Sequence, residues 1–131
     1  MRATRSIWCS TLLLVAGLFL SGALRAAERP FDAAEFEAAQ RAGKPVLVSV
    51  HADWCPVCRV QEEVLGGLLG RKEFAGFAVF IVDYDLQKAV LKRFGVRSQS
   101  TLIVFKGTKE VARSIAQTNK DAIAADLAKA L

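Results

Sequence analysis

The most informative segment of the chain is Val46-Leu47-Val48-Ser49-Val50-His51-Ala52-Asp53-Trp54-Cys55-Pro56-Val57-Cys58-Arg59. Its first half is apolar and rich in β-branched residues, which is typical of a strand buried on both faces of a sheet. Two cysteines follow at the predicted start of a helix. Pro56, which lies between them, is tolerated there because a first helical turn does not need its missing N–H. A thiol at a helix N-terminus lies in the positive end of the backbone dipole, which favours its thiolate, and a thiol three residues later shares its face. The stretch therefore predicts a reversible dithiol–disulfide couple.

The first 26 residues have the layout of a secretory signal peptide. A basic segment with Arg2 and Arg5 precedes an apolar run over 7–23, and small residues follow at Ala26 and Ala27. We expect cleavage after Ala26 or Ala27, which leaves one domain over 28–131. An uncleaved membrane anchor is the alternative, because the run is near the lower limit of about 17 residues for a spanning helix.

The net charge of +5 belongs largely to this leader. Removing its three arginines from the 18 basic residues leaves 15 against 13 acidic ones, a net charge of +2. The basic balance therefore does not predict a nucleic-acid partner, and the remaining charges alternate in sign as on solvated helix faces. Cys9 also lies in the leader, so the domain keeps only Cys55 and Cys58. In an exported compartment such an isolated pair is more consistent with a working disulfide than with a structural framework.

The rest of the domain alternates helices and strands. Asp32, with Glu35 three residues later, is predicted to cap a helix that Gly43 ends. Apolar residues at helical spacing carry the cysteine helix to residue 69, and Gly66-Gly67 marks a weak point at which it ends or kinks. The remaining predicted elements are a strand over 77–82, a short helix over 90–94, strands over 101–105 and 110–115, and a final helix capped by Thr118 and Asp121.

This order predicts the topology of the sheet. Two helical crossovers require parallel pairing of the first three strands, and the tight turn over 106–109 makes the fourth strand antiparallel. We therefore expect an α/β fold whose mixed four-stranded sheet, with three parallel strands and one antiparallel edge strand, is flanked by helices.

Two blocks of the sequence resemble the thioredoxin family. Residues 52–58, Ala-Asp-Trp-Cys-Pro-Val-Cys, match its W-C-x-x-C motif, and residues 94–107 match its G-[IV]-x-x-x-P-T-[LI]-x-x-F-x-x-G block. The resemblance covers nearly all of the mature domain. It implies a thioredoxin-like fold and thiol:disulfide exchange with no cofactor beyond the Cys55–Cys58 disulfide. The lead-in Ala-Asp-Trp-Cys is most similar to thiol-reducing domains on bacterial periplasmic electron-transfer proteins.

The resemblance also implies roles for single residues. Cys55 would attack a substrate disulfide, and Cys58 would resolve the mixed disulfide. Helix geometry agrees, because Cys55 is expected to be more exposed and nearer to free helix N–H groups, and Cys58 better buried. Trp54 matches the family's tryptophan beside the site, or it packs at a loop as aromatic residues commonly do. The further residues expected to bind substrate or tune the thiolate are Pro56, Val57, Gln99, Ser100 and Thr101.

Ser49 departs from the family pattern, which has a buried aspartate at this position. A buried carboxylate can relay the proton of the resolving thiol, and serine cannot act as that base. Deprotonation of Cys58 is then left to water, His51 or Asp53. His51, the only histidine, lies two residues beyond Ser49 and so on the same strand face, where it either titrates or simply packs.

Ser100 is the second departure, because it stands where the family has a cis-proline opposite the dithiol. A non-proline cis bond costs about 2.5 to 4 kcal/mol, so the Gln99–Ser100 bond is either strained cis or trans, and a trans bond reshapes the substrate-binding edge at Gln99. A hydroxyl in place of the proline ring also leaves space and polarity beside the sulfurs that could admit a metal ion.

Together these features predict an exported, periplasmic thiol:disulfide oxidoreductase that acts as a reductant or electron carrier. Protein thiols and disulfides are the expected partners, with a membrane electron donor as a further candidate, and we expect a monomer. The alternative is a metal-binding or metal-delivery module that uses Cys55 and Cys58, although two cysteines are half of the usual four-ligand set.

Overall fold

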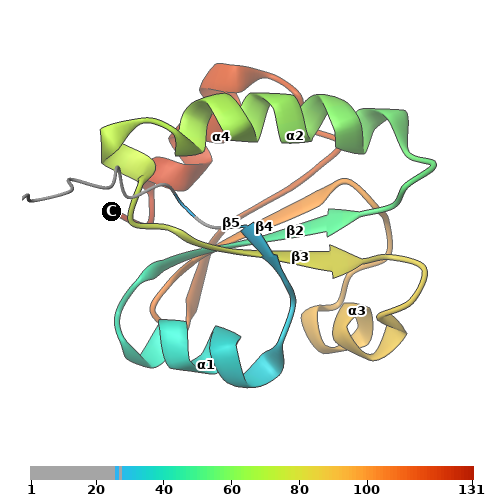
Figure 1. The fold of residues 1–131 in the computed structure, drawn as a ribbon, viewed down its shortest axis with the longest axis horizontal. Coiled ribbons are helices and arrows are strands. Elements are labelled where there is room, and N and C mark those ends of the chain that lie inside the picture. Colours follow the sequence, from blue (N-terminus) through green and yellow to red (C-terminus); the bar gives the residue numbers. More distant parts are fainter. Residues whose placement is uncertain (1–25, 27) are drawn as a thin grey trace, which may run out of the picture.

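The computed structural model describes residue 26 and residues 28–131. Their strands form a five-stranded sheet in the order β1-β3-β2-β4-β5 (Figure 1). Helices α2 and α4 lie on one face of this sheet, and α1 and α3 lie on the other. The elements in chain order are β1 (Glu28–Pro30), α1 (Ala33–Arg41), β2 (Pro45–His51), α2 (Pro56–Leu69), the 3-10 helix η1 (Lys72–Phe74), β3 (Ala78–Asp83), α3 (Lys88–Phe94), β4 (Thr101–Lys106), β5 (Lys109–Ile115) and α4 (Lys120–Ala128). The predicted α/β architecture, a mixed sheet flanked by helices on both faces, is confirmed.

The strand β2 is central and supplies both layers of the core. Val46, Val48 and Val50 are buried in an apolar cluster that also contains Phe36 of α1. Leu47, which points to the other face, packs in a second cluster that includes leucines of α2 and apolar residues of α4. Side chains of a strand alternate between the two faces, so an unbroken apolar run is buried only where both faces are covered. The prediction of a buried central strand is confirmed.

The direction of β4 corrects the predicted topology, because β4 pairs antiparallel with β2. Helix α3 has seven residues and rises about 10 Å, whereas the six-residue strand β3 extends about 20 Å. The helix is therefore too short to return the chain to the opposite end of the sheet, and β4 starts at the end where β3 finishes. Helix α2, with 14 residues and a rise of about 21 Å, does return the chain, so β2 and β3 are parallel.

The strand count and one helix start also differ from the prediction. The three-residue strand β1 pairs parallel with β3 as a fifth strand, and it is too short to produce a periodic sequence signal. Helix α4 is capped by Asn119, whose side chain accepts the N–H of Ala122, and not by Thr118. The Asp32 cap of α1 is confirmed, because its carboxylate accepts the N–H of Glu35 at 2.9 Å. Helix α2 continues through the glycine pair to Leu69.

Apart from Ala26, the leader predicted over residues 1–26 lies outside the described residues. Among the residues that are described, no helix has both the length and the apolarity that crossing a membrane requires.

Candidate active site

The two cysteines lie at the C-terminal end of the central strand. The chain leaves β2 at His51, turns with a Cys55 N–H to Ala52 C=O bond of 3.0 Å, and enters α2 at Pro56. Cys55 is the N-cap of α2, and its Sγ accepts the N–H of Cys58 at 3.1 Å. Cys55 and Cys58 form a disulfide with their Cα atoms 5.3 Å apart. In Figure 1 this helix start, the end of β3 and helix α3 lie at the same end of the molecule.

The exposure of the two cysteines differs from the prediction. Cys55 is 1% exposed and Cys58 is 2% exposed, so the first cysteine is not the more accessible one in the disulfide form. The reason is the direction of the Cys55 side chain, which turns inward to contact Ser100 and packs with Ala52 and Cys58. Access to the sulfurs therefore depends on the turn that carries Ala52 and on the loop that carries Ser100.

Ser100 lies directly against the disulfide. Its Oγ is 3.0 Å from Cys55 Sγ and 3.2 Å from Cys58 Sγ. The Gln99–Ser100 bond is trans, since no cis peptide occurs in the described residues. Ser100 has a φ of 59°, in the left-handed region, where a non-glycine residue costs on the order of 1–3 kcal/mol. Proline requires a φ near −65° and has no N–H, so this backbone could not hold the family's proline.

Three hydrogen bonds hold the backbone of Ser100 in this conformation. Its N–H donates to Val50 C=O at 2.9 Å, which ties it to the end of β2. Its C=O accepts the N–H of Ala116 at 2.9 Å and Nε2 of Gln61 at 3.1 Å. Backbone strain persists where surrounding contacts over-determine a conformation, and they do so here.

Gln61 is a site-supporting residue that sequence reasoning missed. It is 1% exposed on α2, and its Nε2 donates both to Ser100 C=O and, at 2.8 Å, to Gln117 C=O. Its position was a usable signal, because it follows Cys58 by three residues and so shares the buried helix face with Leu65. A polar side chain on an apolar face requires a partner.

His51 lies between two carboxylates. Its Nε2 is 3.1 Å from Asp53 Oδ1 within hydrogen-bond geometry. Its Nδ1 is 2.6 Å from Glu62 Oε1 but outside the directional geometry of a hydrogen bond, so this contact is an ion pair only when the ring is protonated. Glu62 was missed by sequence reasoning, although it lies one helical turn beyond Cys58. Within the described residues, neither His51 nor Asp53 makes a hydrogen bond to a cysteine sulfur. Ser49 is buried at 4% exposure.

Trp54 is 57% exposed and is held in one orientation from the loop after β3. Its Nε1 donates to Asp85 Oδ2 at 2.8 Å, and its ring meets Tyr84 edge-on with centroids 6.5 Å apart. The Tyr84 hydroxyl donates in turn to Arg97 C=O at 3.3 Å. The exposed indole is therefore a positioned surface beside the cysteines, and its two partners carried no sequence signal.

The remaining predicted site residues divide between the surface and the scaffold. Pro56 is exposed at the first turn of α2, and Val57 packs against the two cysteines. Thr101 is buried, and its Oγ1 donates to Ser98 C=O at 2.7 Å, so its hydroxyl is occupied by the loop. Gln99 is partly exposed next to Ser100.

In the described residues no group of three or more His, Cys, Asp or Glu side chains is arranged to hold a metal ion. The two sulfurs are joined to each other in this structure.

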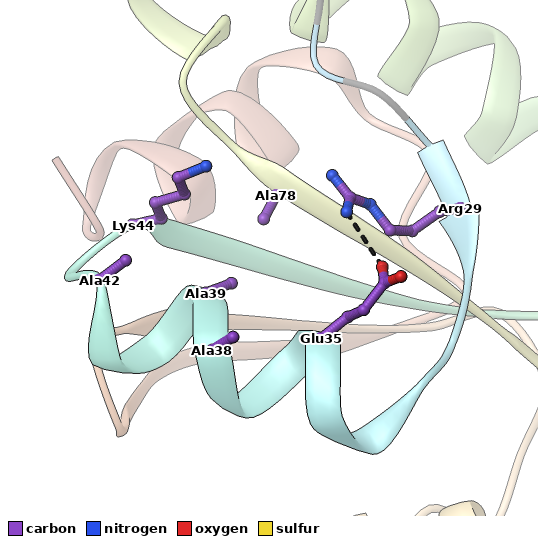
Figure 2. A pocket seen from close by; sticks show the side chains of 7 residues that line it. All are labelled: Arg29, Glu35, Ala38, Ala39, Ala42, Lys44 and Ala78. Carbon is purple, nitrogen blue, oxygen red and sulfur yellow. Dashed lines mark hydrogen bonds and ion pairs between the residues drawn. The ribbon is translucent and has the colours of Figure 1, made fainter.

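Two of the pockets in the described residues lie at opposite ends of the sheet. One of about 330 Å³ reaches His51 at the dithiol end and is lined by Pro30, His51, Ile81, Asp83, Leu86 and Gln87. The other, of about 220 Å³, lies where β2 and β3 begin, between α1 and the sheet (Figure 2). Its alanines face the space, and the Arg29–Glu35 ion pair of 3.0 Å borders it. Because strand β2 spans about 23 Å, this second pocket is remote from the cysteines.

Comparisons with known proteins agree with this geometry. The family model named Thioredoxin matches residues 29–129. A thioredoxin of Alicyclobacillus acidocaldarius is 35% identical over 103 residues, covering 75% of this chain and 92% of the relative. A thioredoxin of Chlamydia muridarum is 36% identical over 78 residues, covering 60% and 74%. The crystal structure of Trxlp from Edwardsiella tarda superimposes with a TM-score of 0.75 at 44% identity, covering 77% of this chain and 98% of that chain.

Proposed function

The chain belongs to the thioredoxin family of thiol-disulfide oxidoreductases, and we propose that it is an exported reductant or electron carrier for protein disulfides. Cys55 is the attacking nucleophile and Cys58 is the resolving thiol. The observation that carries the proposal is the N-cap position of Cys55, where its sulfur accepts a helix N–H from Cys58 at 3.1 Å. A sulfur held at that place carries negative charge more easily than one inside the helix.

The exchange proceeds in two displacements. The Cys55 thiolate attacks one sulfur of the substrate disulfide, an S–S bond forms to Cys55, and the electron pair of the broken bond leaves on the other substrate sulfur. The Cys58 thiolate then attacks Cys55 Sγ, and the second substrate sulfur leaves with the electron pair of the mixed disulfide. Two electrons pass to the substrate, whose thiolates take protons from solvent. An external reductant must then return two electrons to Cys55 and Cys58.

Two surface features support a polypeptide substrate. The positioned indole of Trp54 is exposed beside Cys55. The 330 Å³ pocket at the same end is bordered by Leu86, which is 82% exposed. Exposed apolar side chains around a pocket are typical of sites that bind other proteins.

The sequence supports both the proposed export and the proposed direction of electron flow, from the protein to its substrate. The basic segment and apolar run over 1–26 are typical of a leader that directs secretion, and this pattern supports the proposal of a periplasmic domain. The lead-in before Cys55 favours the reducing direction. Mass spectrometry of protein recovered from the envelope tests export: a chain that begins after Ala26 or Ala27 supports it, and a full-length cytoplasmic chain contradicts it.

Reduction of insulin by dithiothreitol tests the exchange. The 28–131 chain should accelerate the reaction, Cys55→Ser should abolish the acceleration, and Cys58→Ser should stall with substrate bound to Cys55. A Cys55→Ser variant as active as the parent would contradict the assignment of the nucleophile. Stalling in Cys55→Ser instead of Cys58→Ser would reverse the two roles.

A further inference from the structure

The hydroxyl of Ser100 is shared between the two sulfurs, at 3.0 Å from Cys55 Sγ and 3.2 Å from Cys58 Sγ. Sulfurs in a disulfide carry no proton, so the hydroxyl is the donor, and its single proton serves one sulfur at a time. We infer that Ser100 is a catalytic residue that donates its O–H to the Cys55 thiolate in the attacking step and to the Cys58 thiolate in the resolving step. This role of Ser100 rests on the proposed exchange through Cys55 and Cys58, and it applies to either direction of electron flow.

In the first step the Cys55 thiolate has two donors. One is the N–H of Cys58 at 3.1 Å, and the other is the Ser100 hydroxyl. Hydrogen bonds to an ionised sulfur favour the charged form, and those to a charged group are about twice as strong as neutral ones. The hydroxyl therefore raises the fraction of reduced protein that carries the nucleophile.

The second step depends on Ser100 more strongly. Once Cys55 is bonded to substrate, the negative charge must form on Cys58, whose Sγ lies 3.2 Å from Ser100 Oγ and 3.9 Å from Val50 C=O. The carbonyl is an acceptor and cannot stabilise a thiolate. Ser49 offers no carboxylate, and His51, whose Nε2 is hydrogen-bonded to Asp53, makes no hydrogen bond to either sulfur within the described residues. A rotation of the Ser100 hydroxyl supplies the short hydrogen bond that the Cys58 thiolate needs.

The chemistry balances without change to the serine. The proton of the Cys58 thiol passes to the buffer, and its sulfur lone pair forms the bond to Cys55 Sγ. The substrate sulfur leaves with the former bonding pair and is protonated from the buffer. Ser100 is neither oxidised nor deprotonated, so it lowers the barrier only through its hydrogen bond.

The structure holds Ser100 ready for this task. The residue is 2% exposed, and its backbone is fixed by Val50, Ala116 and Gln61 in a left-handed conformation. A donor fixed before the reaction requires no reorganisation when the charge develops. Only the hydroxyl torsion has to change between the two steps.

Two-phase release of thionitrobenzoate from 5,5′-dithiobis(2-nitrobenzoate) separates the steps in reduced 28–131 protein. The first phase reports attack by Cys55, and the second reports displacement by Cys58. Ser100→Ala removes the hydroxyl, and Ser100→Gly removes it while also relieving the left-handed strain. Ser98→Ala is the matched control, because it deletes another hydroxyl of the same loop that donates to Gln99 C=O.

Losing the bond should slow the second phase about tenfold or more in both Ser100→Ala and Ser100→Gly, as expected for one hydrogen bond to a charged group. The pH midpoint for alkylation of Cys55 should rise by about one unit, and the reduction potential should fall by about 30 mV, which is a tenfold change in equilibrium constant. Ser98→Ala should match the parent.

A second phase in folded Ser100→Ala that equals the parent would overturn the inference. So would slowing in Ser100→Ala that Ser100→Gly relieves, because that pattern would assign the effect to the backbone. Thermal melts of each oxidised variant establish folding. A parent chain that showed no exchange at all would instead contradict the proposed function.

Discussion

The buried amide of Gln61 should be worth a measurable share of the stability of the domain. Its Nε2 donates to Ser100 C=O at 3.1 Å and to Gln117 C=O at 2.8 Å, and so joins α2 to the loops before β4 and after β5. Gln61→Met keeps an unbranched side chain of similar length and removes both donors. We expect the free energy of unfolding to fall by about 2–3 kcal/mol, from about 1 kcal/mol for each bond and the added cost of a carbonyl left without its partner.

Urea unfolding of the oxidised 28–131 chain, followed by far-ultraviolet circular dichroism, measures this difference. For a domain of this size the loss corresponds to a fall in Tm of roughly 10 °C. Gln40→Met on α1 is the matched control, because Gln40 is only partly buried, and such surface changes usually lie within about 0.5 kcal/mol. The second phase of thiol exchange should slow in Gln61→Met as well, because Ser100 loses one of its three backbone restraints.

A loss below about 0.5 kcal/mol in Gln61→Met would contradict this expectation, because it would mean that the two bonds contribute no net stability. A loss as large in Gln40→Met would refute it in another way, because the effect would then follow from the methionine and not from the buried contacts.

Three further outcomes follow from particular contacts. Ser100→Pro should destabilise the oxidised domain by about 3 kcal/mol or more in urea unfolding, because φ is 59° and the N–H bonds Val50; an unchanged midpoint would contradict this. Asp85→Ala should lower the fluorescence anisotropy of Trp54 in the 28–131 chain by freeing the indole, at a cost below about 1 kcal/mol because the bond is exposed; an anisotropy equal to the parent's would show that Tyr84 alone holds the ring. The hydrogen bond from Arg113 lowers the pKa of Glu110, so this pair stabilises the fold above the unfolded pKa of Glu110 and less as pH falls through its lower folded pKa. Glu110→Gln should therefore lose only a few tenths of a kcal/mol at pH 7 and nothing in strong acid; a loss that persists in acid would show a cause other than charge.

The features that sequence predicted well are those set by neighbouring residues. Cys55 caps α2 because a strand end, a turn and Pro56 follow one another directly in the chain. The buried strand β2 was predictable because a short run of apolar, β-branched residues is typical of a strand buried on both faces. These signals depend on a few adjacent positions, so no knowledge of the remaining fold was needed.

The features that sequence missed depend on distance through space. Gln61 bonds a residue 39 positions away and Trp54 bonds one 31 positions away, and neither partner has a distinctive local pattern. The direction of β4 follows from the length of α3 compared with that of β3. The sequence prediction took only the order of helices and strands into account. The left-handed backbone of Ser100 is held by three partners, which come from β2, from α2 and from the residue that follows β5.

The exposure of Cys55 was predicted wrongly for the same reason. A helix N-cap is usually accessible, and this favoured an exposed first cysteine. The inward turn of its side chain toward Ser100 depends on a loop 45 residues later. The local element was predictable, and the covering segment was not.

The reduction potential of the Cys55–Cys58 couple distinguishes a reductant of protein disulfides from an oxidant. It is measured on the 28–131 chain by equilibration with glutathione buffers, with Cys58→Ser as the control that cannot form the intramolecular disulfide. The proposed reducing role predicts a single two-electron transition between about −270 and −200 mV, in the range of thioredoxins and glutaredoxins. A potential near −120 mV, as in a strong oxidant, would contradict the reducing role, and the absence of a reversible transition would contradict the redox couple itself.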